Sequence, residues 1–533
     1  MTSVEAFLGL LFAAILIALI AKRLDQPFPI ALVLGGVGLA LIPGVPRISL
    51  SPEMIFFLLL PPILTEAAFF TSWRDFIRYR RPIFILAFGL VIATSTLVAF
   101  LCVHFIPGMT WATGFLVGAI VSPPDAAAAT SIVRGMGLPK RVVQIIEGES
   151  LVNDAAGLTL YRFAVAVVVG GSFSWESAAL SFSWIVVGGA GVGVALGYSY
   201  VKLYRFLRDP QVEILSTFLL SYLSYFAAEW MHASGVLATV ASGLILGWHA
   251  PELFTANGRI RGVAVWQTAV FVINAAMFLL IGLQIPSVLE GLQGYPVGML
   301  VWWSTIVLAG VIVIRMAWVF PGAYLPRLLF KSVRETEELP TWRGVVVIGW
   351  TGLRGVVSLA GALALPMETG RGLPFPYRNL ILLLTFVVIV GTLFLQGLTL
   401  RPLVRWLGLP RDRSSEEENL NARIYSTEKV IERLTQLGEQ GKSAGATFDR
   451  IRRYYEDRIA DLRGRLEIEQ GMDEVSSPQG FQSLGEQRLW YESMRIEREA
   501  LLEMRRDRKI GDEALHEIER DIDLMEARIV PQG

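Results

Sequence analysis

The sequence predicts an all-α polytopic membrane protein with about thirteen transmembrane helices, followed by a helical cytoplasmic domain. Apolar residues make up 53% of the 533 residues and the mean hydropathy is +0.52, which is too apolar for a soluble chain of this length. Residues 1–410 hold 26 Lys and Arg against 19 Asp and Glu, whereas residues 411–533 hold 21 against 28. We therefore expect a membrane domain over 1–410 and a charged, water-facing tail over 411–533.

Thirteen apolar segments are long enough to be candidate transmembrane helices, since roughly 20 residues cross the hydrocarbon core. They lie near residues 4–21, 28–46, 52–70, 82–105, 111–134, 141–169, 182–204, 212–231, 235–250, 264–284, 297–320, 343–366 and 379–400. The segments at 28–46 and 235–250 are short or rich in glycine and are the weakest of the set.

The loops between these segments differ sharply in positive charge. With the N-terminus outside, the cytoplasmic loops hold 18 Lys and Arg, and the outer loops hold only Arg47, Arg371 and Arg378. Because positively charged loops stay in the cytoplasm, we expect an outside N-terminus and a cytoplasmic tail. The first segment has no basic stretch before it and is interpreted as a retained span, not a signal peptide. The lack of targeting signals and the compact tail favour a prokaryotic plasma (inner) membrane as the expected location.

The tail is expected to be helical near 420–440, 446–470, 482–509 and 512–529. Apolar residues recur at helical spacing in its second helix, which favours pairing of tail helices. No nucleotide-binding fingerprint, metal-ligand cluster or catalytic motif is present in the tail sequence. A packing or assembly domain is the favoured interpretation, and a regulatory ligand site is the alternative.

Several classes of protein are excluded by what the sequence contains. Cys102 is the only cysteine, which excludes a disulfide-rich secreted protein. The sequence has no sustained basic stretch of the kind that nucleic-acid binding needs, so we expect no nucleic-acid partner. No Ser/His pairing or HExxH motif supports an intramembrane enzyme, and we expect no cofactor.

Ionisable side chains inside the apolar segments are the candidate functional residues, because each costs several kcal/mol at that depth. Five acids lie there: Glu66, Asp125, Glu147, Glu149 and Asp154. Three arginines share this depth: Arg162, Arg315 and Arg354. Carboxylates with hydroxyl and amide groups suit hard cations such as Na⁺, and no His or Cys joins them to favour zinc or copper.

Asp125 follows two consecutive prolines in the sequence Ser122-Pro123-Pro124-Asp125. Neither proline can continue a helix, since each lacks an N–H and clashes with the preceding turn. The span that contains them is therefore expected to be unwound at this point. Irregular backbone at membrane depth is tolerated only within protein or beside a wet cavity, and its carbonyls can then bind a cation. A simple proline kink beside a neutral Asp is the alternative.

The next segment carries a dense set of oxygen groups, residues 147–154, with the sequence Glu-Gly-Glu-Ser-Leu-Val-Asn-Asp. Glu147, Ser150 and Asp154 are spaced i, i+3 and i+7 and share one helix face. Glu149 and Asn153 lie on an adjacent face. Glu147 is near the cytoplasmic end, where an ordinary solvated carboxylate is an equal alternative.

A second double proline, Pro61-Pro62, precedes Glu66. This acid either contributes to the ion site or is a helix-end carboxylate facing the interior. Arg354 lies in a glycine-rich apolar segment and should pair with a carboxylate, for which Glu149 is the candidate. Arg162 and Arg315 are interpreted as interior anchors.

These residues resemble those of the monovalent cation:proton antiporter-1 family, which includes NhaP-type sodium/proton antiporters and animal sodium/proton exchangers. Three motifs carry the resemblance: Phe-Phe-Leu-Leu-Leu-Pro-Pro-Ile (56–63), Glu-Gly-Glu-Ser-Leu-Val-Asn-Asp (147–154) and Gly-Leu-Arg-Gly (352–355). The resemblance covers roughly residues 5–405. It implies thirteen spans with inverted repeats, crossed unwound helices and a dimerisation domain, and hence a homodimer. We expect the transported cation and proton as substrates and membrane lipids as partners.

The resemblance also implies a role for each candidate residue. Asp154 looks like the carboxylate that binds the cation and carries the proton, with Na⁺ held at Asp154, Asp125 and Ser150, and with Asn153 and Glu66 as further members of the site. Glu149 and Arg354 look like a structural ion pair. Many members have Thr-Asp-Pro where this chain has Pro124-Asp125-Ala126, so the ion coordination is expected to differ in detail.

We expect one site that alternately holds a cation or a proton, because burial of a carboxylate favours its protonated form and lets protons compete with Na⁺. Position 153 is Asn, so the Asn-Asp pair has one ionisable group, which favours electroneutral one-for-one exchange. A K⁺/H⁺ antiporter of the same fold is the nearest alternative, and a cation channel is a more distant one.

Overall fold

The computed structural model describes residues 3–23, 28–42, 55–133, 136–170, 175–204, 209–254, 256–369 and 372–409, with short pieces between 424 and 464. The chain forms two units, Met1–Pro410 and Arg411–Gly533. The described pieces of the second unit are helical, and Arg463 pairs with Glu428 at 2.7 Å between two of them. The helices expected over 482–509 and 512–529 lie outside the described residues.

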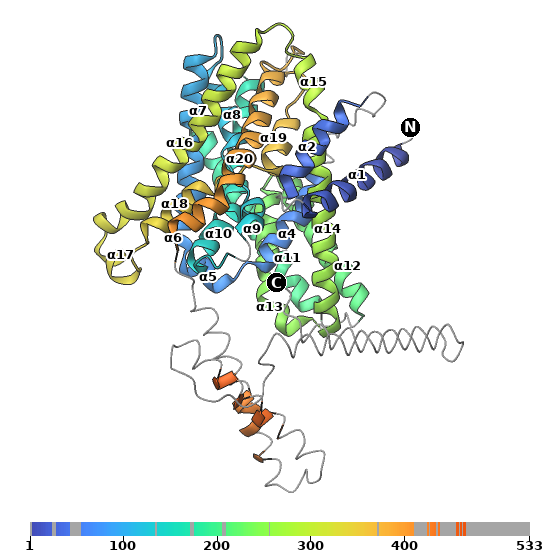
Figure 1. Ribbon diagram of the computed structural model, residues 1–533, viewed down its shortest axis with the longest axis vertical. Helices are drawn as coiled ribbons and strands as arrows, with labels where there is room; N and C mark the ends of the chain where they lie inside the picture. The colour runs from blue at the N-terminus through green and yellow to red at the C-terminus, as the bar shows by residue number, and fades with distance from the viewer. Residues whose placement is uncertain are drawn as a thin grey trace. The chain divides into compact units, whose positions relative to one another are not determined.

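The first unit is built of helices in its described residues (Figure 1). The first half contains α1 (Ser3–Arg23), α2 (Phe28–Ala40), η1 (Ile55–Leu59), α4 (Leu60–Phe70), α5 (Trp73–Arg78), α6 (Arg80–Phe84), η2 (Ile85–Leu90), α7 (Val91–Phe105), α8 (Trp111–Val121), α9 (Ala126–Val133) and α10 (Lys140–Gly170). The second half contains α11 (Trp175–Leu203), α12 (Pro210–Trp230), α13 (Gly235–Leu253), α14 (Ala256–Leu283), α15 (Ile285–Glu290), α16 (Val297–Leu329), α17 (Lys331–Thr336), α18 (Trp342–Trp350), α19 (Val356–Leu363) and α20 (Arg378–Leu407). The labels η1 and η2 mark short π-helical stretches.

Each of the thirteen expected segments coincides with a helix or with a helix that is interrupted. Among the described residues, six helices are long and apolar enough to cross a membrane, judged by length and composition alone. They are Arg80–Phe105, Lys140–Gly170, Leu180–Leu203, Arg261–Glu290, Val297–Leu329 and Arg378–Leu407. The expected total of thirteen crossings stays a prediction.

The helices of the first unit pack as two bundles (Figure 1). The crossover bundle contains α6 to α10 with η2, and α16 and α18 to α20; the scaffold bundle contains α1, α2, α4 and α11 to α14. The crossover bundle contains two sets of three consecutive helical segments. The first set is α6 to α7, α8/α9 and α10, and the second is α16, α18/α19 and α20. The middle segment of each set is a broken helix. This is the arrangement that inverted repeats would produce.

The glycines near residue 190 pack α11 against α13. A Cβ at Gly189 would lie 2.6 Å from the carbonyl oxygen of Ser234, and a Cβ at Gly193 would overlap the carbonyl oxygen of Ala238. Only glycine allows the two backbones to approach this closely, as is common between membrane helices. The small residues on this face therefore serve packing inside one chain.

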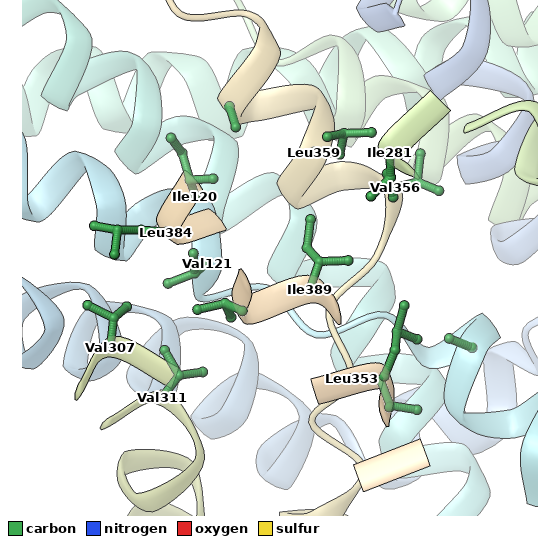
Figure 2. Close-up of a cluster of buried hydrophobic side chains, with 14 of the residues drawn as sticks. Ile120, Val121, Ile281, Val307, Val311, Leu353, Val356, Leu359, Leu384 and Ile389 are labelled. Carbon is green, nitrogen blue, oxygen red and sulfur yellow. The ribbon is translucent and has the colours of Figure 1, made fainter. Parts of the chain in front are cut away.

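A continuous apolar core surrounds the two broken helices of the crossover bundle (Figure 2). Ile120 and Val121 end α8, Leu353 lies in the break between α18 and α19, and Val356 begins α19. All four are at most 4% exposed. This packing encloses the irregular backbone in protein, as segments without regular hydrogen bonding require at membrane depth.

Candidate ion-binding site

The α8/α9 helix is unwound where the sequence has Pro123 and Pro124, as predicted. Asp125 ends the break and caps α9, since its carboxylate Oδ1 accepts a hydrogen bond from the Ala128 N–H at 3.2 Å. The Asp125 N–H donates to the carbonyl oxygen of Leu353 at 2.7 Å. This hydrogen bond joins the two broken helices at their crossing point.

The second break covers residues 351–355, between α18 and α19. A Cβ placed on Gly355 would overlap the Asp125 carboxylate at Oδ2, so Asp125 packs directly on the bare backbone of this glycine. The glycines in this segment did not reveal the break from sequence alone, because no proline marks its position. The close approach of Asp125 explains why glycine is required at position 355.

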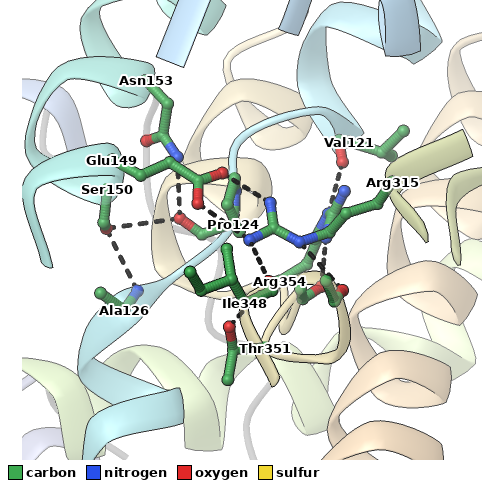
Figure 3. A network of polar contacts seen from close by, with 12 residues as sticks. Val121, Pro124, Ala126, Glu149, Ser150, Asn153, Arg315, Ile348, Thr351 and Arg354 are labelled. Atoms are coloured by element: carbon green, nitrogen blue, oxygen red, sulfur yellow. Dashed lines mark hydrogen bonds and ion pairs between the residues drawn. The ribbon is translucent and has the colours of Figure 1, made fainter. Parts of the chain in front are cut away.

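α10 holds the first break in place through two polar side chains (Figure 3). The Ser150 hydroxyl accepts from the Ala126 N–H at 3.1 Å and donates to the Pro124 carbonyl at 3.3 Å. The Asn153 amide also donates to Pro124, at 3.3 Å. Ser150 and Asn153, on adjacent faces of α10, thus stabilise the backbone that helix unwinding leaves unpaired.

The prediction that Glu149 pairs with Arg354 is wrong, because its partner is Arg315. Arg315 from α16 donates to both carboxylate oxygens of Glu149, at 2.5 and 2.9 Å, and both residues are at most 1% exposed (Figure 3). Arg315 also donates to the carbonyls of Gly349 and Ile348 near the end of α18. Arg315 is thus the structural anchor that links α10, α16 and α18.

Arg354 has a different role. Its Nε donates to the Val121 carbonyl at 2.7 Å, and its Nη1 donates to the carbonyl of Gly352. Val121 is the last residue of α8, where helix carbonyls lack partners and the helix dipole is negative. Arg354 therefore stabilises the end of the broken helix. Sequence spacing could not distinguish the two arginines, because both lie in apolar segments.

A cavity of about 470 Å³ lies between the two bundles. Of the residues predicted to bind the ion, Glu66, Asp125, Ser150 and Asp154 line it, and Glu147 lines it as well. Asp154 is 8% exposed. Asn153 is fully buried and does not line the cavity. The cavity thus brings four acids and a hydroxyl, from three different helices, to one space.

Neutral polar residues that the sequence reasoning did not select also line this cavity. They are Thr71, Thr130, Ser131, Gln267, Asn274 and Ser358. Among the described residues, none makes a hydrogen bond with the buried Ser358 hydroxyl. None of the six is ionisable, so the cost of a charge at membrane depth did not single them out. Asn274 is nevertheless the only polar side chain in residues 269–283.

An apolar layer lies between the two bundles beyond Asp154. Leu158, from α10, packs in a buried cluster with Tyr225, Val236 and Val240 of the scaffold bundle. Just past this layer, Arg162 of α10 pairs with Glu229 of α12 at 2.5 Å. The layer and the ion pair join the two bundles on the side of Asp154 away from Glu147.

Comparison with known proteins gives a consistent result over this part of the chain. The family model described as sodium/hydrogen exchanger, transmembrane, matches residues 10–406. An uncharacterized Na⁺/H⁺ exchanger of Mycobacterium tuberculosis is 31% identical over 506 residues, which are 94% of this chain and 92% of that protein.

Two further relatives have more specific names. A sodium, potassium, lithium and rubidium/H⁺ antiporter of Bacillus pumilus is 32% identical over 74% of this chain and 61% of that protein. The Na⁺/H⁺ antiporter NhaH of Halobacillus dabanensis is 31% identical over 75% of this chain and 96% of that protein.

Among solved structures, that of the sodium proton antiporter MjNhaP1 from Methanocaldococcus jannaschii at pH 8 resembles this fold. It matches with a TM-score of 0.60 at 20% identity, over 76% of this chain and 98% of that chain.

Proposed function

The chain belongs to the sodium/hydrogen exchanger family, and from this premise we propose that it exchanges Na⁺ for H⁺ at the cavity around Asp154. The observation that carries the proposal is the presence of two carboxylates, Asp125 and Asp154, in one cavity where two broken helices cross. Carboxylate, hydroxyl and carbonyl oxygens are the ligands that a hard monovalent cation prefers. The site needs no cofactor for this exchange.

The exchange follows from competition for one carboxylate. Asp154 carries either a proton or a cation, and both states neutralise its charge. With neither bound, the buried charge would have to move through a low-dielectric barrier, which is costly. The loaded forms therefore cross and the empty form does not. Because position 153 is Asn, we propose an electroneutral one-for-one stoichiometry.

The geometry supports an open path on one side of the site. Thr71, Ser131 and Glu147 line the cavity near the ends of helices that the distribution of Lys and Arg assigns to the cytoplasmic side. The opposite side is closed by the apolar layer at Leu158 and the Arg162–Glu229 pair. We propose that the crossover bundle moves against the scaffold bundle to reverse this arrangement.

The finer setting of the protein is also proposed. Its N-terminus would be outside and its tail cytoplasmic, in the plasma membrane of a cell that uses the inward proton gradient to expel the cation. A homodimer is the proposed assembly, in line with the family resemblance. The name of the Bacillus pumilus relative supports K⁺ as an alternative substrate.

The direct test is transport in proteoliposomes with a preset pH gradient and a pH-sensitive dye. We expect Na⁺ and Li⁺ to dissipate the gradient, with no change when the membrane potential is clamped. Dissipation by K⁺ alone would replace the proposed substrate. Cation conductance without proton movement would instead indicate a channel, and no response from folded protein would refute the exchange.

The close fit between Asp125 and Gly355 gives a prediction of its own. Gly355→Ala should reduce the exchange rate by roughly tenfold or more, because the added methyl overlaps the Asp125 carboxylate and displaces it from the site. Gly361→Ala, in α19 just after this break, is the matched control, since its Cβ would lie 3.6 Å from Ile120 and fits. Equal rates in the two variants, both folded, would show that the position of Asp125 does not matter for exchange.

A further inference from the structure

A single amide interrupts an otherwise apolar stretch of α14. Residues 269–283 are all apolar or glycine except Asn274. A polar group at this depth is unfavourable unless it has a partner or a function. Among the described residues, none makes a hydrogen bond with the half-buried Asn274 side chain.

Asn274 lines the cavity that contains the carboxylates. It lies on the scaffold bundle, whereas Asp125, Ser150 and Asp154 lie on the crossover bundle. Gln267, seven residues earlier on the same helix, lines the cavity too. Positions i and i+7 share one helix face, so α14 presents two amides along the wall of the cavity.

The chemistry of an amide suits this place. Its oxygen is a hard ligand for Na⁺, and it is neutral at every pH. A cation near Asn274 can therefore gain this oxygen as a ligand without a second titrating group beside Asp154.

We propose that the Asn274 amide oxygen contacts the transported cation, directly or through one water, while the cavity is open to the side of Glu147. The cation would then lie between a ligand on the scaffold bundle and ligands on the crossover bundle. Movement of one bundle against the other would break this contact, so Asn274 would raise the cation affinity of one state only. This inference rests on the proposed exchange of a cation for a proton.

The test is sided transport by Asn274→Ala and by Asn274→Ser, which keeps an oxygen. For Asn274→Ala we expect the KM for Na⁺ on the Glu147 side to rise roughly tenfold, with the maximal rate and the KM on the other side nearly unchanged. Asn274→Ser should be intermediate. Thr268→Ala is the matched control: Thr268 is exposed on the same helix, donates only to Ala264 in its own helix, and does not line the cavity.

A wild-type KM on both sides in folded Asn274→Ala would overturn the inference and leave the exchange itself intact. A second measurement separates the two failures. Na⁺ should raise the Tm of the purified wild-type protein, because a ligand of the native state stabilises it. A smaller Na⁺-dependent shift in Asn274→Ala would support the contact even if proteoliposomes showed no exchange. An equal shift in both proteins would count against it.

Discussion

Replacing Asp154 by Asn is expected to abolish cation/proton exchange while leaving the protein folded. Asparagine has nearly the same shape, so the packing of α10 should survive the change. It cannot take up a proton or neutralise a cation, so both loaded forms of the site are lost. We expect the exchange rate in proteoliposomes to fall to the level of vesicles without protein, for Na⁺, Li⁺ and K⁺ alike.

Glu147→Gln is the matched control for this experiment. It removes a carboxylate from the same helix face and from the wall of the same cavity. Glu147 lies two turns nearer the open end than Asp154, so its loss should weaken attraction of the cation without removing the exchange site. We expect a raised KM and a retained maximal rate. Exchange in folded Asp154→Asn at the wild-type rate would refute the assignment of Asp154.

The predictable parts of the site are those in which local chemistry decides the structure. Pro123 and Pro124 lack the N–H that a continuing helix needs, and the break before Asp125 was predicted from them. The 3.6-residue period placed Glu147, Ser150 and Asp154 on one face, and all three line the cavity. In each case the outcome depends on neighbours in the chain and not on distant helices.

The features that sequence reasoning missed depend on contacts between distant segments. The break at residues 351–355 contains no proline; it is stabilised by the hydrogen bond from Asp125 to Leu353 and by the Arg354 contact with Val121. Whether Glu149 meets Arg315 or Arg354 depends on how α10 and α16 pack, which no spacing within one helix determines. The amide of Asn274 became a candidate only once α14 was known to border the cavity.

The Glu149–Arg315 pair gives the largest expected effect on stability. Both residues are at most 1% exposed, and removing one partner leaves a buried charge without compensation. Such a loss costs about 3–5 kcal/mol, which is a large part of the stability of a typical domain. We expect Arg315→Met and Glu149→Leu each to lower the Tm and the yield of folded protein in detergent severely.

The double variant Glu149→Leu/Arg315→Met should be less destabilised than the sum of the two single changes, because no unpaired charge remains. A buried ion pair replaced by apolar side chains often costs little. The control is a second double-mutant cycle, in which Arg354→Met takes the place of Arg315→Met beside Glu149→Leu. Arg354 donates to the carbonyls of Val121 and Gly352, and its removal strands no carboxylate.

The two cycles separate the two possible partners of Glu149. Residues in direct contact couple by about 0.5–3 kcal/mol, whereas separate sites are close to additive. We expect strong coupling of Glu149 with Arg315 and weaker coupling with Arg354. The reverse order would restore the pairing suggested by the sequence motif and would mean that α16 is anchored differently. With the expected order, the arginine of the Gly-Leu-Arg-Gly motif stabilises the end of a broken helix, and the acid of the 147–154 motif is stabilised by an arginine outside all three motifs.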